Sequence, residues 1–416
     1  MADTIDRGGM APGPPGRVPG EDCRINALLL HAISFLGTRQ AVQTCVLSRR
    51  WRHLWRSVDR INATRHEFDG MADSEEKRDF LFKKFTNRFL MLRNPVPLDE
   101  FQLSYYMPDQ EVSVDPDADS EDANLWIRHA LQSNARSVEV KIWADRLHLD
   151  PAMFASKCFL TSLQLSCVIL FHGFFRNLQT GCPSLEHLLL SYCAIDDVEI
   201  SSQTLKVLTI GDSSNFTSDE QPCIYIPSLS YLGFSASAAR LPLLKDMGSL
   251  VTASVSVDSG DTVADIRRFL RSLSGVTNLE FNYSGKKMCK PEGPQHNMCI
   301  SLKMEKNSKW CPKFNNLTAL TLGEWRLSED YYSLKVFLQN CPNLVKLTLK
   351  PKKCYYTSET NIAELEEGSF TCRHIEMLEI VCSEGGPNPN VLEKLLVKGG
   401  ITFGQVRFRQ TDKNQN

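Results

Sequence analysis

The densest group of side chains that could do chemistry lies in residues 45–58, which read CVLSRRWRHLWRSV. Four arginines, one histidine and two tryptophans in this stretch could bind the phosphates and bases of a nucleic acid. A helical wheel separates the two kinds of side chain. The apolar side holds Leu47, Trp51, Leu54, Trp55 and Val58, and the opposite side holds Arg49, Arg52, His53 and Arg56. Because single-strand binders need rings beside the basic groove, the pattern instead favours a helix with buried tryptophans and solvated arginines.

Other groups that could carry catalysis or bind a metal lack the necessary spacing. The chain has 14 cysteines but no Cys-x-x-Cys, and its nine histidines are scattered. It has neither a phosphate-binding glycine loop nor a Gly-x-Ser-x-Gly turn. The acidic pair Asp196 and Asp197 falls in a loop with no evident partner. We therefore expect a protein that is not an enzyme, with no catalytic residue, metal ligand or cofactor.

The bulk composition narrows the class further. The chain has 416 residues, 42% of them hydrophobic, and a formal net charge of -2, so it has no global basic excess for nucleic acid. No apolar run approaches the length of a membrane span, and no membrane partner is expected. Residues 1–20, rich in glycine and proline, are predicted to be a disordered tail. Without a secretion signal, we expect a cytoplasmic or nuclear protein with reduced thiols.

The positioning elements begin with three helices in residues 21–60. Apolar residues recur at helical spacing in residues 24–36; Gly37 ends this helix, Thr38 caps a second and Ser48 a third. A module of this size needs a partner or a neighbouring domain. Residues 61–97 are predicted to be a linker with one amphipathic helix capped near Ser74, and the acidic residues 109–122 to be a solvated loop.

The remainder of the chain repeats the core Leu-x-x-Leu-x-Leu, which is typical of leucine-rich repeats. Clear copies begin at Leu160, Leu185, Leu205, Leu229, Val276, Leu317, Leu344 and Ile375, and weaker ones at Leu98, Ala135 and Leu250. Each core predicts one strand of a parallel sheet. We expect an α/β fold: a trihelical module followed by a horseshoe solenoid over residues 98–350, a further repeat region over 351–410, and a polar tail at 411–416. Cys182 and Cys341 are predicted to be small buried residues at repeat corners.

Residues between the repeat leucines should point to the concave face of the sheet, because side chains alternate along a strand. These positions are mostly polar and differ between repeats, so they form the candidate recognition surface. They include His187, Thr209, Tyr231, Ser254, Asn278, Glu280, Thr321, Lys346, Thr348 and Lys350.

The helical module resembles the F-box of plant F-box/leucine-rich-repeat proteins. The resemblance is carried by RQAVQTCVLSRRW at residues 39–51. Downstream, GCPSLEHLLLSYC and NCPNLVKLTL resemble the repeats of that family, and CRHIEMLEI and the segment to Arg409 resemble its C-terminal FBD-type region.

The resemblance implies a substrate receptor of an SCF-type ubiquitin ligase. The F-box would bind a Skp-type adaptor, which joins a cullin scaffold, and the repeats would hold an unknown protein substrate. The expected adaptor contacts are Leu28, Ile33, Leu36, Val46, Leu47 and Trp51. The expected substrate contacts are His187, Thr209, Tyr231, Asn278, Glu280, Lys346 and Lys350.

One departure from the family leaves alternatives open. Such F-boxes usually open with Leu-Pro and acidic residues, whereas here Leu28 runs directly into Leu29, Leu30 and His31. A second hypothesis is therefore a leucine-rich-repeat scaffold whose degenerate F-box recruits no ligase. A third, disfavoured by the helical wheel, is nucleic-acid binding through the arginine-rich stretch.

Overall fold

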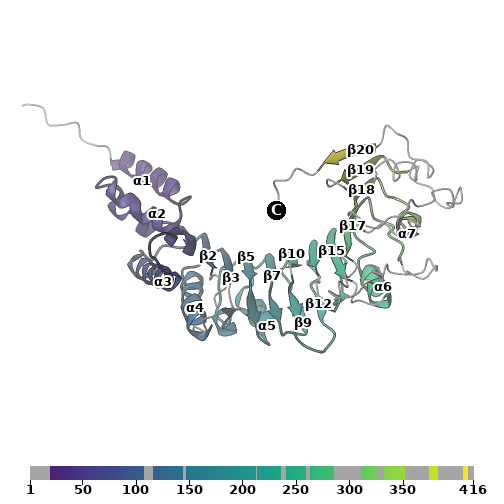
Figure 1. Ribbon diagram of the computed structural model, residues 1–416, viewed down its shortest axis with the longest axis horizontal. Helices are drawn as coiled ribbons and strands as arrows, with labels where there is room; N and C mark the ends of the chain where they lie inside the picture. The colour runs from purple at the N-terminus through teal and green to yellow at the C-terminus, as the bar shows by residue number, and fades with distance from the viewer. Residues whose placement is uncertain are drawn as a thin grey trace, which may run out of the picture.

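The chain folds into one long curved parallel sheet with helices on its outer side, as the computed structural model in Figure 1 shows. The structure describes residues 19–106, 116–143, 147–211, 213–235, 240–258, 263–284, 311–325, 332–351, 374–382 and 406–410. Within these ranges thirteen strands follow one another in chain order, apart from short strands that lie outside the main sheet. The expected α/β horseshoe is confirmed.

The strands of the main sheet are the predicted repeat cores with one addition at each end. They are β1 Arg60–Thr64, β2 Glu100–Tyr106, β3 Ser137–Trp143, β5 Ser162–Ser166, β7 His187–Ser191, β10 Val207–Gly211, β13 Tyr231–Ser235, β15 Thr252–Asp258, β16 Asn278–Ser284, β17 Ala319–Trp325, β18 Lys346–Pro351, β19 Met377–Cys382 and β20 Val406–Gln410. The register aligns equivalent leucines, for example Leu188 with Leu208 and Leu208 with Leu232. Each strand thereby sends the same two positions into the core, since side chains alternate in direction.

Helices and short strands cover the convex side of this sheet. The helices are α4 Pro116–Gln132, η4 Pro151–Phe154, α5 Phe174–Gly181, α6 Val263–Ser272 and α7 Tyr332–Asn340. Two small sheets add β4 Leu147–His148, β6 Val168–Leu170, β8 Ala194–Ile195 and β11 Asn215–Phe216, and then β9 Glu199–Ser201, β12 Cys223–Tyr225 and β14 Leu243–Lys245. Cys182 and Cys341 are fully buried, as predicted.

The solenoid begins earlier than the sequence indicated. Strand β1 pairs in parallel with β2, so the sheet starts at Arg60 and continues into residues 61–97, which were predicted to be a linker. Ile61 and Ala63 fill the two core positions of β1, and the small alanine hides the repeat pattern. Helix α3 (Glu75–Leu92) follows, with Ser74 as its cap as expected. Part of the acidic stretch 109–122 was also misassigned, because α4 begins at Pro116.

The N-terminal module consists of α1 Pro19–Ile33, α2 Thr38–Gln43, η1 Thr44–Val46 and η2 Trp51–Ser57, followed by η3 Arg65–Phe68 beyond β1. The third predicted helix is a 3-10 helix, and Gly37 rather than Thr38 is the cap of α2. The wheel nevertheless gave the correct inward side for Trp55 and Val58, which are buried. It was wrong for Leu47, which lies before η2 and is exposed. The expected tail over residues 1–20 is wrong at residues 19 and 20, which begin α1. Residues 1–18 and 411–416, and residues 352–373 and 383–405 of the predicted FBD-type region, lie outside the described residues.

Asp197 has partners that the sequence did not reveal. Its buried carboxylate accepts hydrogen bonds from the backbone N–H groups of Gly173 (2.6 Å) and Phe175 (3.0 Å) at the start of α5. A residue of the following repeat thus caps this helix and links two repeats. His172 lies 3.4 Å from the same carboxylate.

We expect Asp197→Ala to destabilise the protein by about 1–2 kcal/mol, because two N–H groups at a helix start lose their acceptor. Asp196→Ala is the matched control, since Asp196 is exposed and accepts only a side-chain bond from Thr217 in the described structure. Urea unfolding followed by circular dichroism measures both variants. Equal losses in the two variants would contradict the capping role.

Candidate functional site

Large apolar side chains are exposed on the N-terminal module. Leu28 on α1 is 69% exposed, Phe35 in the α1–α2 turn 67%, and Val46 and Leu47 after α2 82% and 64%. Exposed apolar side chains grouped on one small module are candidate contacts for a partner protein. Phe35 was missed in the sequence because it adjoins the inward-facing Ile33 and Leu36, and periodicity does not reveal the direction of a turn residue.

The six expected adaptor contacts therefore divide into two groups. Leu28, Val46 and Leu47 point to solvent, whereas Ile33 is 1% exposed and belongs to the core. Leu36 and Trp51 are partly buried and pack against that core. Ile33 cannot contact the adaptor directly, because its side chain is buried in the core of the chain itself.

The module is joined to the solenoid through the start of α2. The carboxylate of Glu67, in η3, accepts from the backbone N–H groups of Arg39 (3.1 Å) and Gln40 (3.4 Å). Arg39 in turn donates to the carbonyl oxygen of Glu67 at 2.9 Å. A Cβ on Gly37 would lie 2.2 Å from this carboxylate, so glycine makes room for the contact. The solenoid thus supplies the cap that α2 lacks within the module.

A second junction lies at the end of the module. Arg93, after α3, donates to the carbonyl oxygen of Val58 at 3.0 Å, and the Trp55 and Phe89 rings lie 5.4 Å apart. The pKa of Arg93 is lowered to about 10, because the effect of burial outweighs the opposing attraction of the nearby Asp59 carboxylate. The guanidinium stays charged at neutral pH. Two separate contacts therefore hold the module and solenoid in one orientation.

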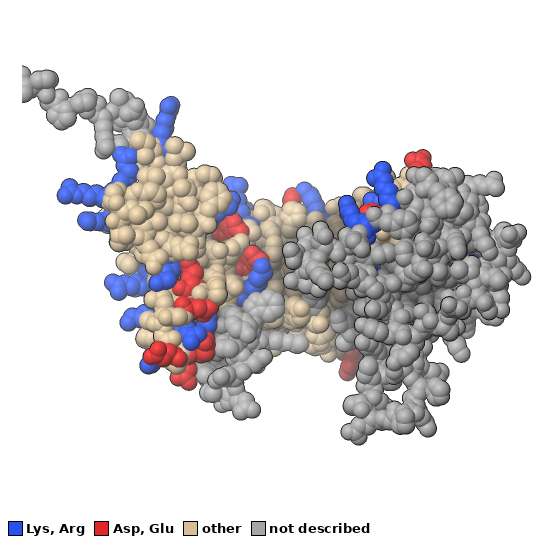
Figure 2. All heavy atoms as spheres, turned by 45° about the horizontal axis from the view of Figure 1, so that its top comes forward, with Lys and Arg blue, Asp and Glu red and all other residues tan. Residues whose placement is uncertain are grey.

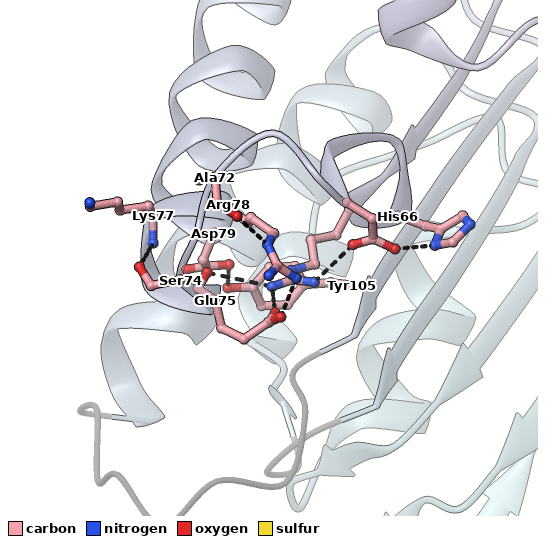
Figure 3. A network of polar contacts seen from close by, with 10 residues as sticks. His66, Ala72, Ser74, Glu75, Lys77, Arg78, Asp79 and Tyr105 are labelled. Carbon is pink, nitrogen blue, oxygen red and sulfur yellow. Dashed lines mark hydrogen bonds and ion pairs between the residues drawn. The ribbon is translucent and has the colours of Figure 1, made fainter.

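A network of charged groups joins η3, α3 and β2 (Figure 3). Arg65 of η3 is buried and pairs with Glu75 at the start of α3 and with Asp69. Glu75 also accepts from Arg78, and Asp79 accepts from the Tyr105 hydroxyl on β2. The contacts tie η3, α3 and β2 together, so they fix the first repeat on which the module rests.

His129 on α4 lies near Arg93. Burial first, and the Arg93 charge second, lower the pKa of His129 below its ordinary 6.5. Its buried Nδ1 has no hydrogen-bond partner among the described residues. The neutral imidazole is therefore the form compatible with the folded chain near neutral pH.

Because the pKa of His129 is lowered in the folded chain, we expect the protein to lose stability on acidification. The unfolded chain takes up a proton at His129 at a higher pH than the folded chain, so the free energy of unfolding falls as pH drops through 6.5. We expect His129→Gln to reduce this fall, measured by urea unfolding at about pH 7.5 and 5.5. Exposed His53 replaced by Gln is the control; an unchanged pH dependence in His129→Gln would contradict the assignment.

The predicted recognition residues lie at the strand positions opposite the core. His187, Lys346 and Lys350 are exposed, and Thr209, Tyr231, Asn278 and Glu280 are partly exposed. Thr348 is 6% exposed and is withdrawn from the set, while Ser254 and Thr321 remain partly exposed. Figure 1 shows the labelled helices of the solenoid on the other side of the sheet, opposite these residues.

Other kinds of site find little support in the described residues. No three His, Cys, Asp or Glu side chains gather where they could hold a metal ion, and no helix there is long and apolar enough to cross a membrane. In the arginine-rich stretch, Arg49 and Arg52 are exposed, whereas Trp55 is buried. The predicted separation of rings from charges holds for Arg49 and Arg52 but not for Arg56, whose half-buried guanidinium lies 5.4 Å from the centre of the Trp55 ring.

The fold and its surfaces define a class: a leucine-rich-repeat solenoid with a helical module fixed to its first repeat. No protein-family model matches the chain. It is similar to the meiotic F-box protein MOF of Oryza sativa subsp. japonica, at 26% identity over 94% of this chain and 85% of that protein.

Two relatives from Arabidopsis thaliana extend the comparison. An F-box/LRR-repeat protein is 28% identical over 78% of this chain and 68% of its own length, and an F-box/FBD/LRR-repeat protein is 26% identical over 78% and 75%. The predicted resemblance to plant F-box/leucine-rich-repeat proteins is confirmed. The names of these relatives support a substrate-recognition adaptor role in general, a role that is generally non-catalytic.

Proposed function

We propose that this protein is the substrate-recognition subunit of an SCF-type ubiquitin ligase. One observation carries the proposal: the exposed apolar residues Leu28, Val46 and Leu47 lie on a module that is separate from the polar concave face of the solenoid. The first surface would bind a Skp-type adaptor and, through it, a cullin scaffold. The second would bind a target protein in the cytoplasm or nucleus.

The proposed contribution to ubiquitin transfer is proximity rather than chemistry. A receptor that holds a target lysine near a charged conjugating enzyme raises its effective concentration. The two junctions at Glu67 and Arg93 suit this role, because a fixed angle between module and solenoid limits the volume that a bound target explores.

The proposed domains follow these surfaces. The substrate-binding solenoid includes β1 and therefore begins at Arg60, so the proposed F-box, predicted over residues 21–60, ends one residue earlier. Candidate substrate contacts are His187, Thr209, Tyr231, Asn278, Glu280, Lys346 and Lys350, and the FBD-like region is placed at residues 351–410.

Co-expression of the full chain with a plant Skp-type adaptor tests the proposal. We expect a one-to-one complex that survives size-exclusion chromatography. A folded chain, verified by circular dichroism, that elutes without the adaptor at micromolar concentration would overturn the ligase assignment.

A second candidate is an interaction scaffold that recruits no ligase. It is favoured by α1, which runs unbroken through Leu28–Ile33 where the family usually opens with Leu-Pro. Inserting a proline and acidic residues after Leu28 separates the candidates. A large gain in adaptor affinity indicates a weakened F-box, and no gain indicates that the missing stretch is dispensable.

A further inference from the structure

Basic side chains gather on the C-terminal end of the concave face. Lys346 and Lys350 lie on β18, and Arg407 and Arg409 lie two strands away on β20. Their side chains are exposed, at 46% for each lysine and 74% for Arg409. Figure 2 shows blue Lys and Arg side chains at this end of the concave face. We call these four residues the basic end.

Two carboxylates partly neutralise the basic end from beneath. Glu379 on β19 lies 3.8 Å from Lys346 and 3.6 Å from Arg409, with 18% of its side chain exposed. Glu280 on β16 lies 2.7 Å from Lys350 and accepts from Ser254. Among the described residues of these strands, four cations thus face two carboxylates, which leaves two positive charges in excess, although the whole chain carries -2.

The rest of the concave face lacks such an excess. The exposed positions of β10, β13 and β15 are uncharged over Val207–Gly211, Tyr231–Ser235 and Thr252–Ser256. At the N-terminal end the charges balance, because Arg60 pairs with Glu100 and Lys141 with Glu139. The excess of positive charge therefore marks one end of a concave face that is otherwise neutral over the described strands.

We propose that the basic end binds an acidic segment of the substrate protein, rich in Asp or Glu. The inference rests on the proposed function, since it assigns a chemical class to the target of the concave face. Neighbouring strands are about 4.8 Å apart, so β18 and β20 are separated by about 10 Å. An extended peptide advances about 3.3 Å per residue and its side chains alternate in direction, so glutamates at every second residue lie on one side about 6.6 Å apart and can reach cations on both strands.

The ion pairs that Glu379 and Glu280 already form with the basic end do not prevent an acidic segment from binding there. Pairs between partly exposed groups contribute little to stability, and an incoming carboxylate can replace or join Glu379 and Glu280 as the counter-ion. Glu379 is held between Lys346 and Arg409, so it keeps the cations in position when no ligand is bound.

The test uses the full chain and three fluorescent 12-residue peptides: alternating Glu-Ser, Gln-Ser and Lys-Ser. Fluorescence anisotropy should detect binding of the Glu-Ser peptide alone, weakening as salt rises. Lys350→Ser with Arg409→Ser should weaken it about tenfold. Lys206→Ser is the matched control, because Lys206 is an exposed, ion-paired lysine (to Glu186) outside the basic end, and it should bind normally.

Several results would overturn the proposal. The proposal fails if the Glu-Ser peptide does not bind, if the Gln-Ser peptide binds with equal affinity, or if inorganic phosphate displaces the Glu-Ser peptide at matched ionic strength. It also fails if the double variant keeps the wild-type affinity, or if Lys206→Ser loses as much affinity as the double variant. The adaptor assay is independent of these measurements. Peptide binding without adaptor binding removes the ligase assignment alone, and the converse removes the acidic-segment assignment alone.

Discussion

Replacing Val46 and Leu47 together with glutamate should abolish binding of the Skp-type adaptor without unfolding the chain. The two side chains are 82% and 64% exposed, so the isolated protein gains little stability from them. At an interface centre, a buried apolar residue contributes about 2 kcal/mol or more, which is roughly thirtyfold in affinity for each. Two buried charges without partners add a desolvation penalty.

Matched controls separate this effect from a general change in surface charge. Met91 and Phe80 on α3 are 77% and 62% exposed, close to the values for Val46 and Leu47. Met91→Glu with Phe80→Glu should leave the adaptor complex intact. Isothermal titration calorimetry measures all affinities, and tight binding by the Val46 and Leu47 variant would refute the assigned surface.

Gly181→Ala should destabilise the solenoid by about 3 kcal/mol, at the upper end for inserting one methyl group. Gly181 ends α5, and a Cβ there would lie 1.7 Å from the carbonyl oxygen of Phe154 and 2.9 Å from that of Ser156. Both obstacles are backbone atoms, so no side-chain rotation relieves the clash. Its own carbonyl accepts from the N–H of Cys158 at 2.8 Å, which holds the two segments together.

Gly248→Ala is the control for this substitution. A Cβ at Gly248 meets nothing within 4 Å, and its backbone is not in the left-handed region. We expect its stability to equal or slightly exceed that of the wild type, because alanine reduces the entropy of the unfolded chain. Thermal unfolding compares the two variants, and similar midpoints would show that η4 moves aside at little cost.

The repeat architecture could be predicted from the sequence because leucine spacing is a local property. The cores at Leu160, Leu185 and Leu344 all became parallel strands, and even the weak core at Ala135 precedes β3. Alternation along a strand then assigned residues such as Lys346 and Lys350 to the concave face. Strand β1 could not be predicted from leucine spacing, because Ala63 occupies a core position at which the repeat pattern has leucine.

The tertiary structure alone decided which apolar residues of the helical module face water. Leu28 and Ile33 look alike in a periodic sequence, yet one is 69% exposed and the other 1%. Exposure depends on which neighbours cover a side chain, and those neighbours include the first repeat as well as the module. Asp197 illustrates the same limit, because its two hydrogen-bond donors come from a helix more than twenty residues earlier.

The sequence by itself thus determined the kind of fold and the concave recognition surface, since both follow from local periodicity, and its resemblance to F-box proteins indicated the second surface. Only the folded chain decided how those surfaces are joined and where charge accumulates. Glu67 and Arg93 fix the module through contacts that no spacing rule contains. The basic end arises because β18 and β20 lie side by side with β19, which brings Lys350 and Arg409 together from positions 59 residues apart in the chain.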